Sequence, residues 1–279
     1  MTIDQAIRQA RSQGVDRLDA QILVLHALHI SVHDRAWLLA HQHDSIPPAA
    51  LALFNCNLER RLTGAPIAYI TGNQEFYGLR LQVDARVLVP RPDTETLVDW
   101  TLEQLQCCAN ASILDLGTGS GAIALALKHQ RPDWQVHAVD YSHDALAVAQ
   151  ANAAALNINI HWSQGAWLQN ITQRFHAIVS NPPYIAEQDP HLSALQHEPQ
   201  QALVSGTDGL DDIRAIVLQA PRHLHNAGWL LLEHGYDQAQ AVSTMLREAG
   251  FVQVQSRCDL AGIARCTGGC WQSSVTTAA

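Results

Sequence analysis

Lysine is nearly absent from this sequence. Lys128 is the only lysine among the 17 Lys and Arg residues, and no block of basic residues occurs. The 26 acidic residues bring the formal net charge to -9. A protein that binds nucleic acid through its phosphates usually carries a basic patch or stripe. The composition therefore argues against a general nucleic-acid binder, and we expect no direct nucleic-acid binding.

Long hydrophobic runs are also missing. The longest apolar stretch, residues 122–127, is far shorter than the roughly 20 residues that a membrane-spanning helix needs. The N-terminal residues lack the basic-then-apolar pattern of a signal peptide. We therefore expect a cytoplasmic protein that has no membrane segment.

The six cysteines lack the spacing of a metal site. Cys258, Cys266 and Cys270 cluster near the end, but the sequence has no CxxC-like pair and no evident fourth ligand. Structural zinc sites need such a set. We interpret the cysteines as reduced thiols and expect no bound metal.

The first part of the chain has the apolar spacing of helices. Hydrophobic residues make up 47% of the sequence and charged ones 15%, which suits a globular protein with a substantial core. Leu18, Ile22 and Leu25 recur at helical spacing, and similar patterns fill residues 1–72. Residues 73–90 instead alternate apolar and polar side chains. We predict a small helical domain over residues 1–72 and a β-hairpin linker over residues 73–90.

Residues 91–279 alternate between strand and helix patterns. We predict strands over residues 112–116, 135–139, 158–162, 176–180, 228–233, 251–257 and 264–272, and helices over 94–106, 120–130, 143–156, 209–224 and 236–249. Such alternation is typical of a mostly parallel sheet covered by helices on both faces. The fold class is therefore α/β, with a Rossmann-like domain built on a seven-stranded sheet. The tail, residues 273–279, is predicted to be disordered.

A glycine-rich turn follows the first strand of this domain. Gly117, Gly119 and Gly121 allow a tight turn and a close approach of a ligand to the backbone. Asp140 ends the next strand, where its carboxylate can accept hydrogen bonds from ribose hydroxyls. Ligands of parallel sheets bind outside the carboxyl ends of the strands. The pattern therefore indicates a nucleotide-like cofactor.

Two other interpretations of this turn are a dinucleotide site and a turn that binds no ligand. The third glycine comes one residue too early for the dinucleotide fingerprint. Asp115 also precedes the turn, where a pyrophosphate would meet a like charge. S-adenosylmethionine carries a sulfonium and no phosphate, so it fits this turn better.

The tetrapeptide Asn181-Pro182-Pro183-Tyr184 directly follows the strand predicted over residues 176–180. Two consecutive prolines stiffen the loop and fix the Asn181 side chain relative to the Pro182 carbonyl. Both groups can accept hydrogen bonds from an NH2 group on a planar system, and Tyr184 offers a ring for stacking. We predict that Asn181, Pro182 and Tyr184 are catalytic and that the methyl acceptor is a planar amide-type nitrogen. The alternative is that Asn181-Pro182-Pro183 is only a structural turn with no catalytic role.

These motifs resemble the N5-glutamine methyltransferases of peptide chain release factors, the PrmC/HemK family. The resemblance extends over residues 18–265 and includes the segments 76–79, 87–95, 115–121, 181–185, 198–203 and 231–235. Asn-Pro-Pro-Tyr alone is shared with enzymes that methylate exocyclic amines of adenine or guanine. The segment Pro90-Arg91-Pro92-Asp93-Thr94-Glu95 and the Glu198-Pro199 loop point to the release factor family.

The resemblance implies a domain plan and a reaction. Residues 1–72 would recognise the substrate, and residues 91–279 would form the methyltransferase domain. S-adenosylmethionine would donate a methyl group to the glutamine N5 in the Gly-Gly-Gln motif of class I release factors. S-adenosylhomocysteine would be the product, and translation termination would be modulated. We expect the chain to act as a monomer.

The resemblance also implies site residues. The expected cofactor-binding residues are Gly117, Thr118, Gly119, Ser120, Gly121, Asp140, Trp167 and Asn181. The expected substrate-binding residues are Asn181, Pro182, Pro183 and Tyr184. Trp167 would lie beside the adenine. Family members usually carry an acidic residue at the position of Ala166, so one hydrogen bond worth about 0.5–1.5 kcal/mol is expected to be missing.

Two other functions remain open from sequence. An N6-adenine or N2-guanine nucleic-acid methyltransferase would use the same Asn-Pro-Pro-Tyr motif, but the charge of -9 disfavours it. A non-catalytic scaffold that binds S-adenosylmethionine is disfavoured by the intact Asn181 and Tyr184.

Several charged residues near the motifs have two interpretations each. Glu233 either shapes the pocket or is a solvated acid at a strand end. Glu198 belongs either to a lid over residues 185–207 or to a helix cap. Arg91 and Glu95 are expected to form an ion pair, although Thr94 and Glu95 can instead line the pocket mouth. His234 is a weak candidate for a base.

Overall fold

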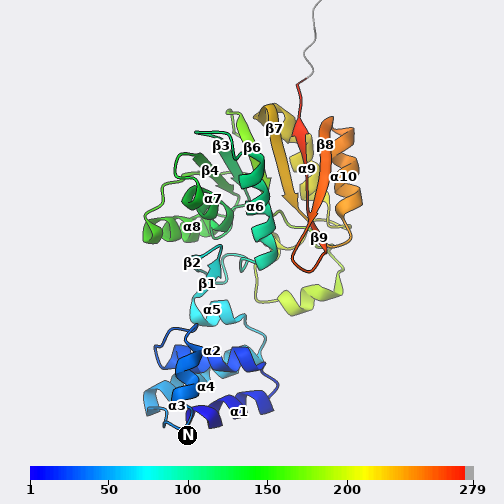
Figure 1. Cartoon of the computed structure of the whole chain (residues 1–279). Coiled ribbons are helices and arrows are strands. Elements are labelled where there is room, and N and C mark those ends of the chain that lie inside the picture. The colour runs from blue at the N-terminus through cyan, green and yellow to red at the C-terminus, as the bar shows by residue number, and fades with distance from the viewer. Residues whose placement is uncertain (274–279) are drawn as a thin grey trace, which may run out of the picture. The chain divides into compact units, whose positions relative to one another are not determined.

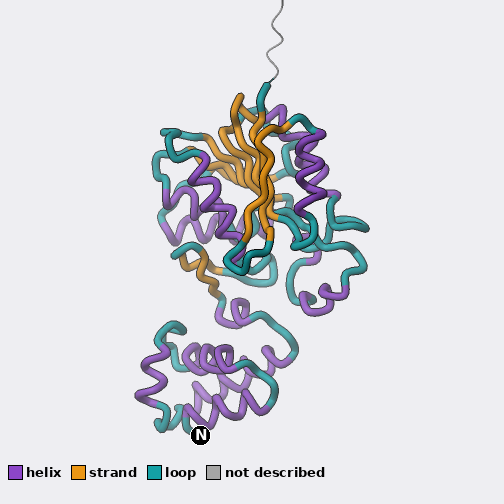
Figure 2. The backbone as a smooth tube through the Cα atoms, turned by 45° about the vertical axis from the view of Figure 1, so that its right-hand side comes forward, coloured by secondary structure: helices purple, strands orange, loops and turns teal. Residues whose placement is uncertain are grey.

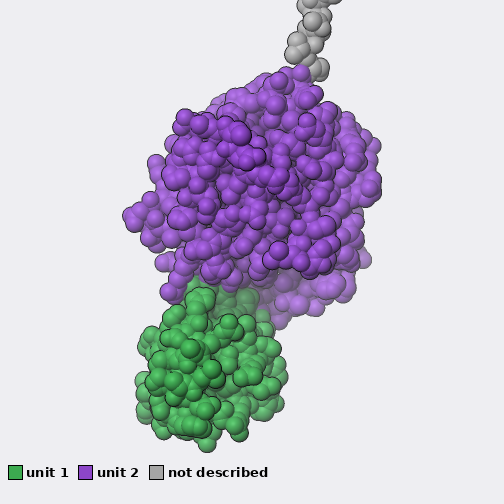
Figure 3. Space-filling view, in the orientation of Figure 1, with its two compact units in different colours: residues 1–73 green, residues 74–279 purple. Residues whose placement is uncertain are grey.

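The computed structural model describes residues 1–273 of the chain. They form two compact units, residues 1–73 and, within the described part, residues 74–273, which are coloured separately in Figure 3. The sequence-based prediction of a disordered tail concerned residues 273–279, of which 274–279 lie outside the described part.

The first unit is made of helices. They are α1 (Ile3–Ser12), α2 (Arg17–Ala27), α3 (Arg35–His41), α4 (Pro48–Leu62) and α5 (Ile67–Thr71). The first helix begins with a capping box, in which Thr2 accepts from the Gln5 amide and the Gln5 side chain accepts from the Thr2 amide. Apolar residues such as Leu23 and Phe54 are fully buried in one core.

The second unit is built on a seven-stranded sheet (Figure 1). Its strands are β3 (Ser112–Leu116), β4 (Gln135–Asp140), β5 (His161–Gln164), β6 (Phe175–Ser180), β7 (Leu224–Glu233), β8 (Phe251–Cys258) and β9 (Ala264–Trp271). The strand order is β5-β4-β3-β6-β7-β9-β8. The first five of these strands are parallel, and β9 is antiparallel to both β7 and β8. The predicted Rossmann-like α/β class and the mostly parallel seven-stranded sheet are confirmed.

Helices cover both faces of this sheet (Figure 2). They are α6 (Glu95–Gln104), α7 (Ala122–Gln130), α8 (His143–Leu156), α9 (Asp211–Gln219) and α10 (Ala239–Glu248). Because successive strand residues point to opposite faces, Ile113 packs with α6 and α7 while Leu114 packs with α9 and α10. The continuous apolar run of β3 is thus explained by burial on both faces.

Several predicted boundaries were wrong; β7, for example, begins at Leu224 rather than at residue 228. The strand predicted over residues 158–162 lies at His161–Gln164, because the left-handed Asn157 ends α8 and the chain needs the next residues to return to the sheet. The helix predicted over residues 209–224 ends at Gln219 and continues as a 3-10 turn, Ala220–His223. Pro221 within that turn has no amide hydrogen to continue an α-helix.

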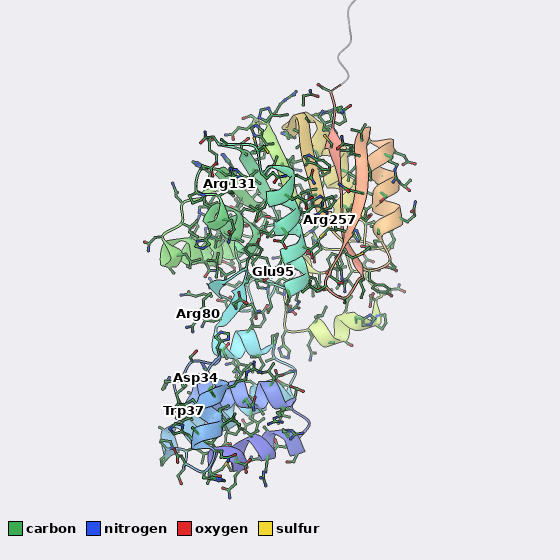
Figure 4. The ribbon with its side chains drawn as sticks, in the orientation of Figure 1. Asp34, Trp37, Arg80, Glu95, Arg131 and Arg257 are labelled. Carbon is green, nitrogen blue, oxygen red and sulfur yellow. The ribbon has the colours of Figure 1, made fainter. Side chains whose placement is uncertain are left out.

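A two-stranded hairpin precedes α6. Its strands are β1 (Asn73–Phe76) and β2 (Leu79–Gln82). Tyr77 and Gly78 between them both have positive φ, 52° and 77°, as a tight two-residue hairpin turn requires. Glu95, labelled in Figure 4, accepts a hydrogen bond from the Tyr77 amide at 2.9 Å. The first turn of α6 therefore holds the hairpin.

Gly268 in β9 is required by close packing against β7. A Cβ atom at Gly268 would lie 2.5 Å from Leu231 Cδ2 and 2.6 Å from the Leu230 carbonyl oxygen. Gly268→Ala is therefore expected to lower the free energy of unfolding by about 1–3 kcal/mol, as overpacking of a core does. Urea denaturation measures this, with Gly165→Ala as the control, because the nearest atom to a Cβ there is 3.4 Å away. If the two variants unfolded at the same midpoint concentration of urea, the packing argument would be contradicted.

Candidate active site

A cavity of about 310 Å³ lies where the loops after β3, β4, β5 and β6 meet. Its walls are formed by Arg86, Val87, Leu88, Gly117, Gly119, Asp140, Tyr141, Ser142, Ala145, Gly165, Ala166, Trp167, Asn181, Pro183, Pro199, Gln201, Ala202 and Asp212. These loops follow the carboxyl ends of parallel strands, which is where ligands of such sheets bind.

The glycine-rich turn forms one wall. Gly117, Gly119 and Gly121 all have positive φ, a conformation that favours glycine. At Gly117 a Cβ atom would also lie 3.3 Å from the Trp167 ring. The absence of a side chain therefore leaves room for the indole on the cavity wall.

Asp140 joins the glycine turn to the loop after β4. Its Oδ2 accepts from the Gly119 amide at 2.8 Å, and its Oδ1 accepts from the Ser142 amide at 2.8 Å. Burial raises the pKa of Asp140, and these amide donors partly oppose that rise. Each carboxylate oxygen has two lone pairs, so both oxygens retain capacity for a ligand in the cavity.

Asp115, by contrast, is buried behind the turn. Its Oδ2 accepts from the Thr118 hydroxyl at 2.6 Å and from the Ala124 amide at 3.2 Å. Burial is the main effect, and it raises the pKa of Asp115 to about 7 despite these donors. Its Oδ1 has no hydrogen-bond partner in the described chain. Asp115 thus organises the turn from inside rather than lining the cavity.

Trp167 forms another wall, close to the end of β5. Its backbone has a positive φ of 53°, and its Nε1 donates to Asp212 Oδ1 at 3.1 Å. Asp212, in the first turn of α9, accordingly lies on the cavity wall beside the indole. Ala166 lies on the same wall and offers no polar side chain.

The Asn181 corner closes the cavity after β6. Asn181 Nδ2 donates to Thr94 Oγ1 at 3.2 Å, which leaves Asn181 Oδ1 as an acceptor. Asn181 and Pro183 line the cavity, whereas Pro182 is buried. Tyr184 packs against the α9 and α10 core, and its carbonyl accepts from Gln238 Nε2 at 3.0 Å. Burial also raises the pKa of the Tyr184 hydroxyl.

The predicted ion pair between Arg91 and Glu95 was wrong. Arg91 instead forms an ion pair with Glu198, whose Oε2 also accepts from the Val89 amide at 3.1 Å. Glu198 is buried, and it does not cap a helix. It therefore ties residues 185–207 to the segment that carries the cavity residues Val87 and Leu88.

The end of β7 is buried. Glu233 is 1% exposed, so the alternative of a solvated acid was wrong. Next to it, His234 is also buried, with Nδ1 2.8 Å from the Gly235 carbonyl and Nε2 2.7 Å from Thr267 Oγ1. Both ring nitrogens are therefore occupied, and burial lowers the His234 pKa. This pattern assigns His234 a structural role.

The structure brings together most, but not all, of the predicted site residues. Gly117, Gly119, Asp140, Trp167, Asn181 and Pro183 share the cavity, whereas Thr118, Ser120, Gly121, Pro182 and Tyr184 lie outside its wall. Sequence reasoning did not assign Arg86, Gln201 or Asp212 to the site. Gln201 lies within the motif segment 198–203, and Arg86 directly precedes the motif segment 87–95, so both were close to a recognised motif. No motif pointed to Asp212.

Residues 1–273 lack two further features. No group of three or more His, Cys, Asp or Glu side chains is arranged to hold a metal ion there. Within the same residues, no helix is long and apolar enough to cross a membrane.

Comparisons with known proteins agree with this geometry. The family model described as "Methyltransferase small domain" matches residues 94–255, and "PrmC N-terminal domain" matches residues 2–72. A release factor glutamine methyltransferase of Coxiella burnetii is 45% identical over 251 residues, covering 89% of this chain and 90% of that protein. A release factor glutamine methyltransferase of Pseudomonas aeruginosa is 47% identical over 259 residues, covering 91% of this chain and 92% of that protein.

A solved structure shares the fold. It is the Thermus thermophilus 16S rRNA N2 G1207 methyltransferase in complex with AdoMet and guanosine, with a TM-score of 0.54 at 19% identity, covering 72% of this chain and 50% of that one. The sheet, the cavity at its carboxyl edge and the matched domain define an S-adenosylmethionine-dependent methyltransferase. More specifically, the chain belongs to the family of release factor glutamine methyltransferases.

Proposed function

We propose that this chain transfers a methyl group from S-adenosylmethionine to the glutamine N5 of the Gly-Gly-Gln motif in class I release factors, and so modulates translation termination. The observation that carries the proposal is the orientation of Asn181. Its NH2 group is bound to Thr94, so its carbonyl oxygen is the atom available at the cavity wall to a substrate amide.

The residues of the cavity suit this cofactor. Asp140 offers carboxylate oxygens for the ribose hydroxyls, and the Trp167 ring offers a flat apolar surface for the adenine. Gly117 and Gly119 present backbone without side chains, so a ligand can approach closely. When bound, S-adenosylmethionine supplies a methyl group on a positively charged sulfur and leaves as S-adenosylhomocysteine.

Asn181 and Pro182 would act on the substrate amide. An amide nitrogen is a weak nucleophile because its lone pair is delocalised into the carbonyl. In our proposal, Asn181 Oδ1 and the Pro182 carbonyl each accept one N–H bond of the glutamine NH2 group. These two bonds hold the face of the nitrogen toward the methyl group and increase its electron density. Orientation of two reactants can contribute up to about 7–11 kcal/mol to lowering a barrier.

Tyr184 would complete the substrate site without serving as a base. Its raised pKa keeps the phenol protonated at neutral pH, so it can pack against the glutamine plane but cannot accept a proton. No base is needed before methyl transfer, because the methylated nitrogen becomes acidic and loses its proton afterwards.

The helical unit, residues 1–73, is the proposed site of release factor recognition, and we propose that the enzyme acts as a monomer on protein rather than on nucleic acid. Support comes from the match of residues 2–72 to the PrmC N-terminal domain and from the net charge of -9.

A transfer assay tests the proposal. The purified chain is incubated with methyl-labelled S-adenosylmethionine and a class I release factor, and the labelled peptide is mapped. We expect one label on the Gly-Gly-Gln glutamine and none on a release factor whose glutamine is replaced by alanine. Label that appears only on RNA or DNA would reject the proposal in favour of a nucleic-acid methyltransferase. Cofactor binding without any transfer would favour a scaffold.

A further inference from the structure

One buried acid near the Asn181 corner has no assigned role in the mechanism above. Glu233 ends β7 and is 1% exposed, and its Oε2 has no hydrogen-bond partner in residues 1–273. A buried carboxylate without full hydrogen bonding is unfavourable, so its presence needs a reason other than stability.

Thr94 connects this acid to Asn181. Its side chain is buried, at 4% exposure, where α6 begins. Thr94 Oγ1 accepts a hydrogen bond from Asn181 Nδ2 at 3.2 Å. Glu233 in turn interacts with the side chains of both Thr94 and Tyr184, whose hydrogen bonds lower its pKa. The three side chains thus form a chain of hydrogen bonds from β7 through the start of α6 to the corner after β6.

The direction of these hydrogen bonds follows from which of the three side chains can donate a hydrogen and which can only accept one. A threonine hydroxyl has one hydrogen and two lone pairs, whereas an ionised carboxylate can only accept. If Glu233 is ionised, the Thr94 hydrogen points to Glu233 and only lone pairs remain for Asn181. Asn181 must then present its NH2 group to Thr94. If Glu233 is protonated, it can donate to Thr94, the Thr94 hydrogen becomes free, and Asn181 can flip.

We infer that Thr94 and Glu233 are positioning residues that hold the Asn181 amide with its carbonyl oxygen toward the methyl-accepting nitrogen. This inference rests on the proposed function. A flipped Asn181 would direct NH2 hydrogens at the substrate NH2 group, so two donors would face each other. Neither Thr94 nor Glu233 lies on the cavity wall, and both act through Asn181.

The surroundings of Glu233 affect its charge. Burial is the largest influence and raises its pKa to about 7; Asp93 also raises it, while Thr94, Arg265 and Tyr184 lower it. The thiol of Cys266 also faces Glu233 and has a raised pKa of its own, so it stays neutral near pH 7. Orientation of Asn181 is therefore expected to improve as the pH rises through about 7.

Substitution of Thr94 tests the hydrogen-bond chain. Thr94→Val keeps the shape of the side chain but removes the hydroxyl, and we expect kcat to fall roughly tenfold, the effect of losing one orienting hydrogen bond. KM for the release factor and the Kd of S-adenosylmethionine should change less than twofold. Thr94→Ser should restore most of kcat because it restores the hydroxyl.

Thr101→Val is the matched control. Thr101 is a fully buried threonine of the same helix, and its hydroxyl donates only within the helix, to the Leu97 carbonyl at 2.7 Å. This variant should keep the wild-type kcat. Equal kcat for Thr94→Val and the wild type, or failure of Thr94→Ser to recover, would overturn the inference.

The pH profile of kcat tests Glu233. We expect the wild-type kcat to rise with pH through an inflection near 7, and Glu233→Gln, which cannot titrate, to lose that inflection. Asp115 also has a pKa of about 7, so the assignment depends on the inflection disappearing in Glu233→Gln. An unchanged inflection in this variant would overturn the role of Glu233.

These outcomes can be separated from a failure of the proposed function. If the wild type does not methylate the Gly-Gly-Gln glutamine, the proposed function fails. If the wild type does so and the Thr94 and Glu233 variants behave like it, only the positioning inference fails.

Discussion

Replacing Asn181 by alanine is expected to lower kcat for release factor methylation by about a hundredfold or more. The expectation follows from losses of about 10²–10³ in kcat when one preorganised hydrogen-bonding group of an active site is removed. Alanine cannot accept the N–H bond that fixes the glutamine nitrogen, and it leaves Thr94 Oγ1 without its donor. The Pro182 carbonyl alone would then let the amide rotate.

Two measurements on the same protein check this expectation. Single-turnover kinetics report the chemical step, and calorimetry reports the Kd of S-adenosylmethionine, which should change only a few-fold. Asn159→Ala is the control, because Asn159 is exposed and lies in a loop before β5. If kcat and cofactor affinity fall equally, Asn181 mainly holds the cofactor, and the proposed substrate role is wrong.

The fold was largely predictable from local patterns. An apolar run ends at Leu116, and strand and helix patterns alternate after it. These patterns predict a sheet buried on both faces, and they could be recognised because hydrophobic periodicity depends only on residues close together in the sequence. Boundaries were less predictable. Asn157 ends α8 in a left-handed conformation, and nothing in the apolar pattern of the next residues showed that the strand begins only at His161.

The candidate site was predictable only where one motif contains it. The glycine turn and the Asn181 corner each form a continuous segment, so both could be located before the structure was known. The partner of Arg91 could not, because Glu198 lies 107 residues away and an acid nearer in sequence, Glu95, offered an equally good charge. Side chains that meet only through tertiary packing have no fixed spacing in the sequence, so no sequence pattern reveals their contact.

Asp212 and the pair of Thr94 and Glu233 illustrate the same limit. Asp212 reaches Trp167 because the loop after β6 returns α9 to the cavity, 45 residues further along the chain. Thr94 was considered for the pocket mouth, but its contact with Asn181 depends on where α6 begins relative to β6. These arrangements are properties of the folded domain rather than of any local pattern.

The second large effect is expected at Asp140. Asp140→Ala should raise the Kd of S-adenosylmethionine about a hundredfold or more, because hydrogen bonds to a charged group contribute about 1.5–3 kcal/mol each and two ribose hydroxyls would lose their acceptor. S-adenosylhomocysteine should lose the same affinity, since its ribose is identical. Asp144→Ala is the matched control, because Asp144 lies in the first turn of α8 and its side chain is 75% exposed.

The design must separate the lost ligand contact from a loosened turn, because Asp140 also accepts from the Gly119 and Ser142 amides. Asp140→Asn keeps one acceptor oxygen and much of that structure, so its Kd should fall between those of the wild type and Asp140→Ala. The free energy of unfolding without cofactor reports the contribution of the two amide contacts alone. If both variants bind S-adenosylmethionine within twofold of the wild type, Asp140 serves only to shape the glycine turn. The cavity would then have to hold the ribose through another group, and Asp212 is the only other carboxylate on the wall that the described residues form.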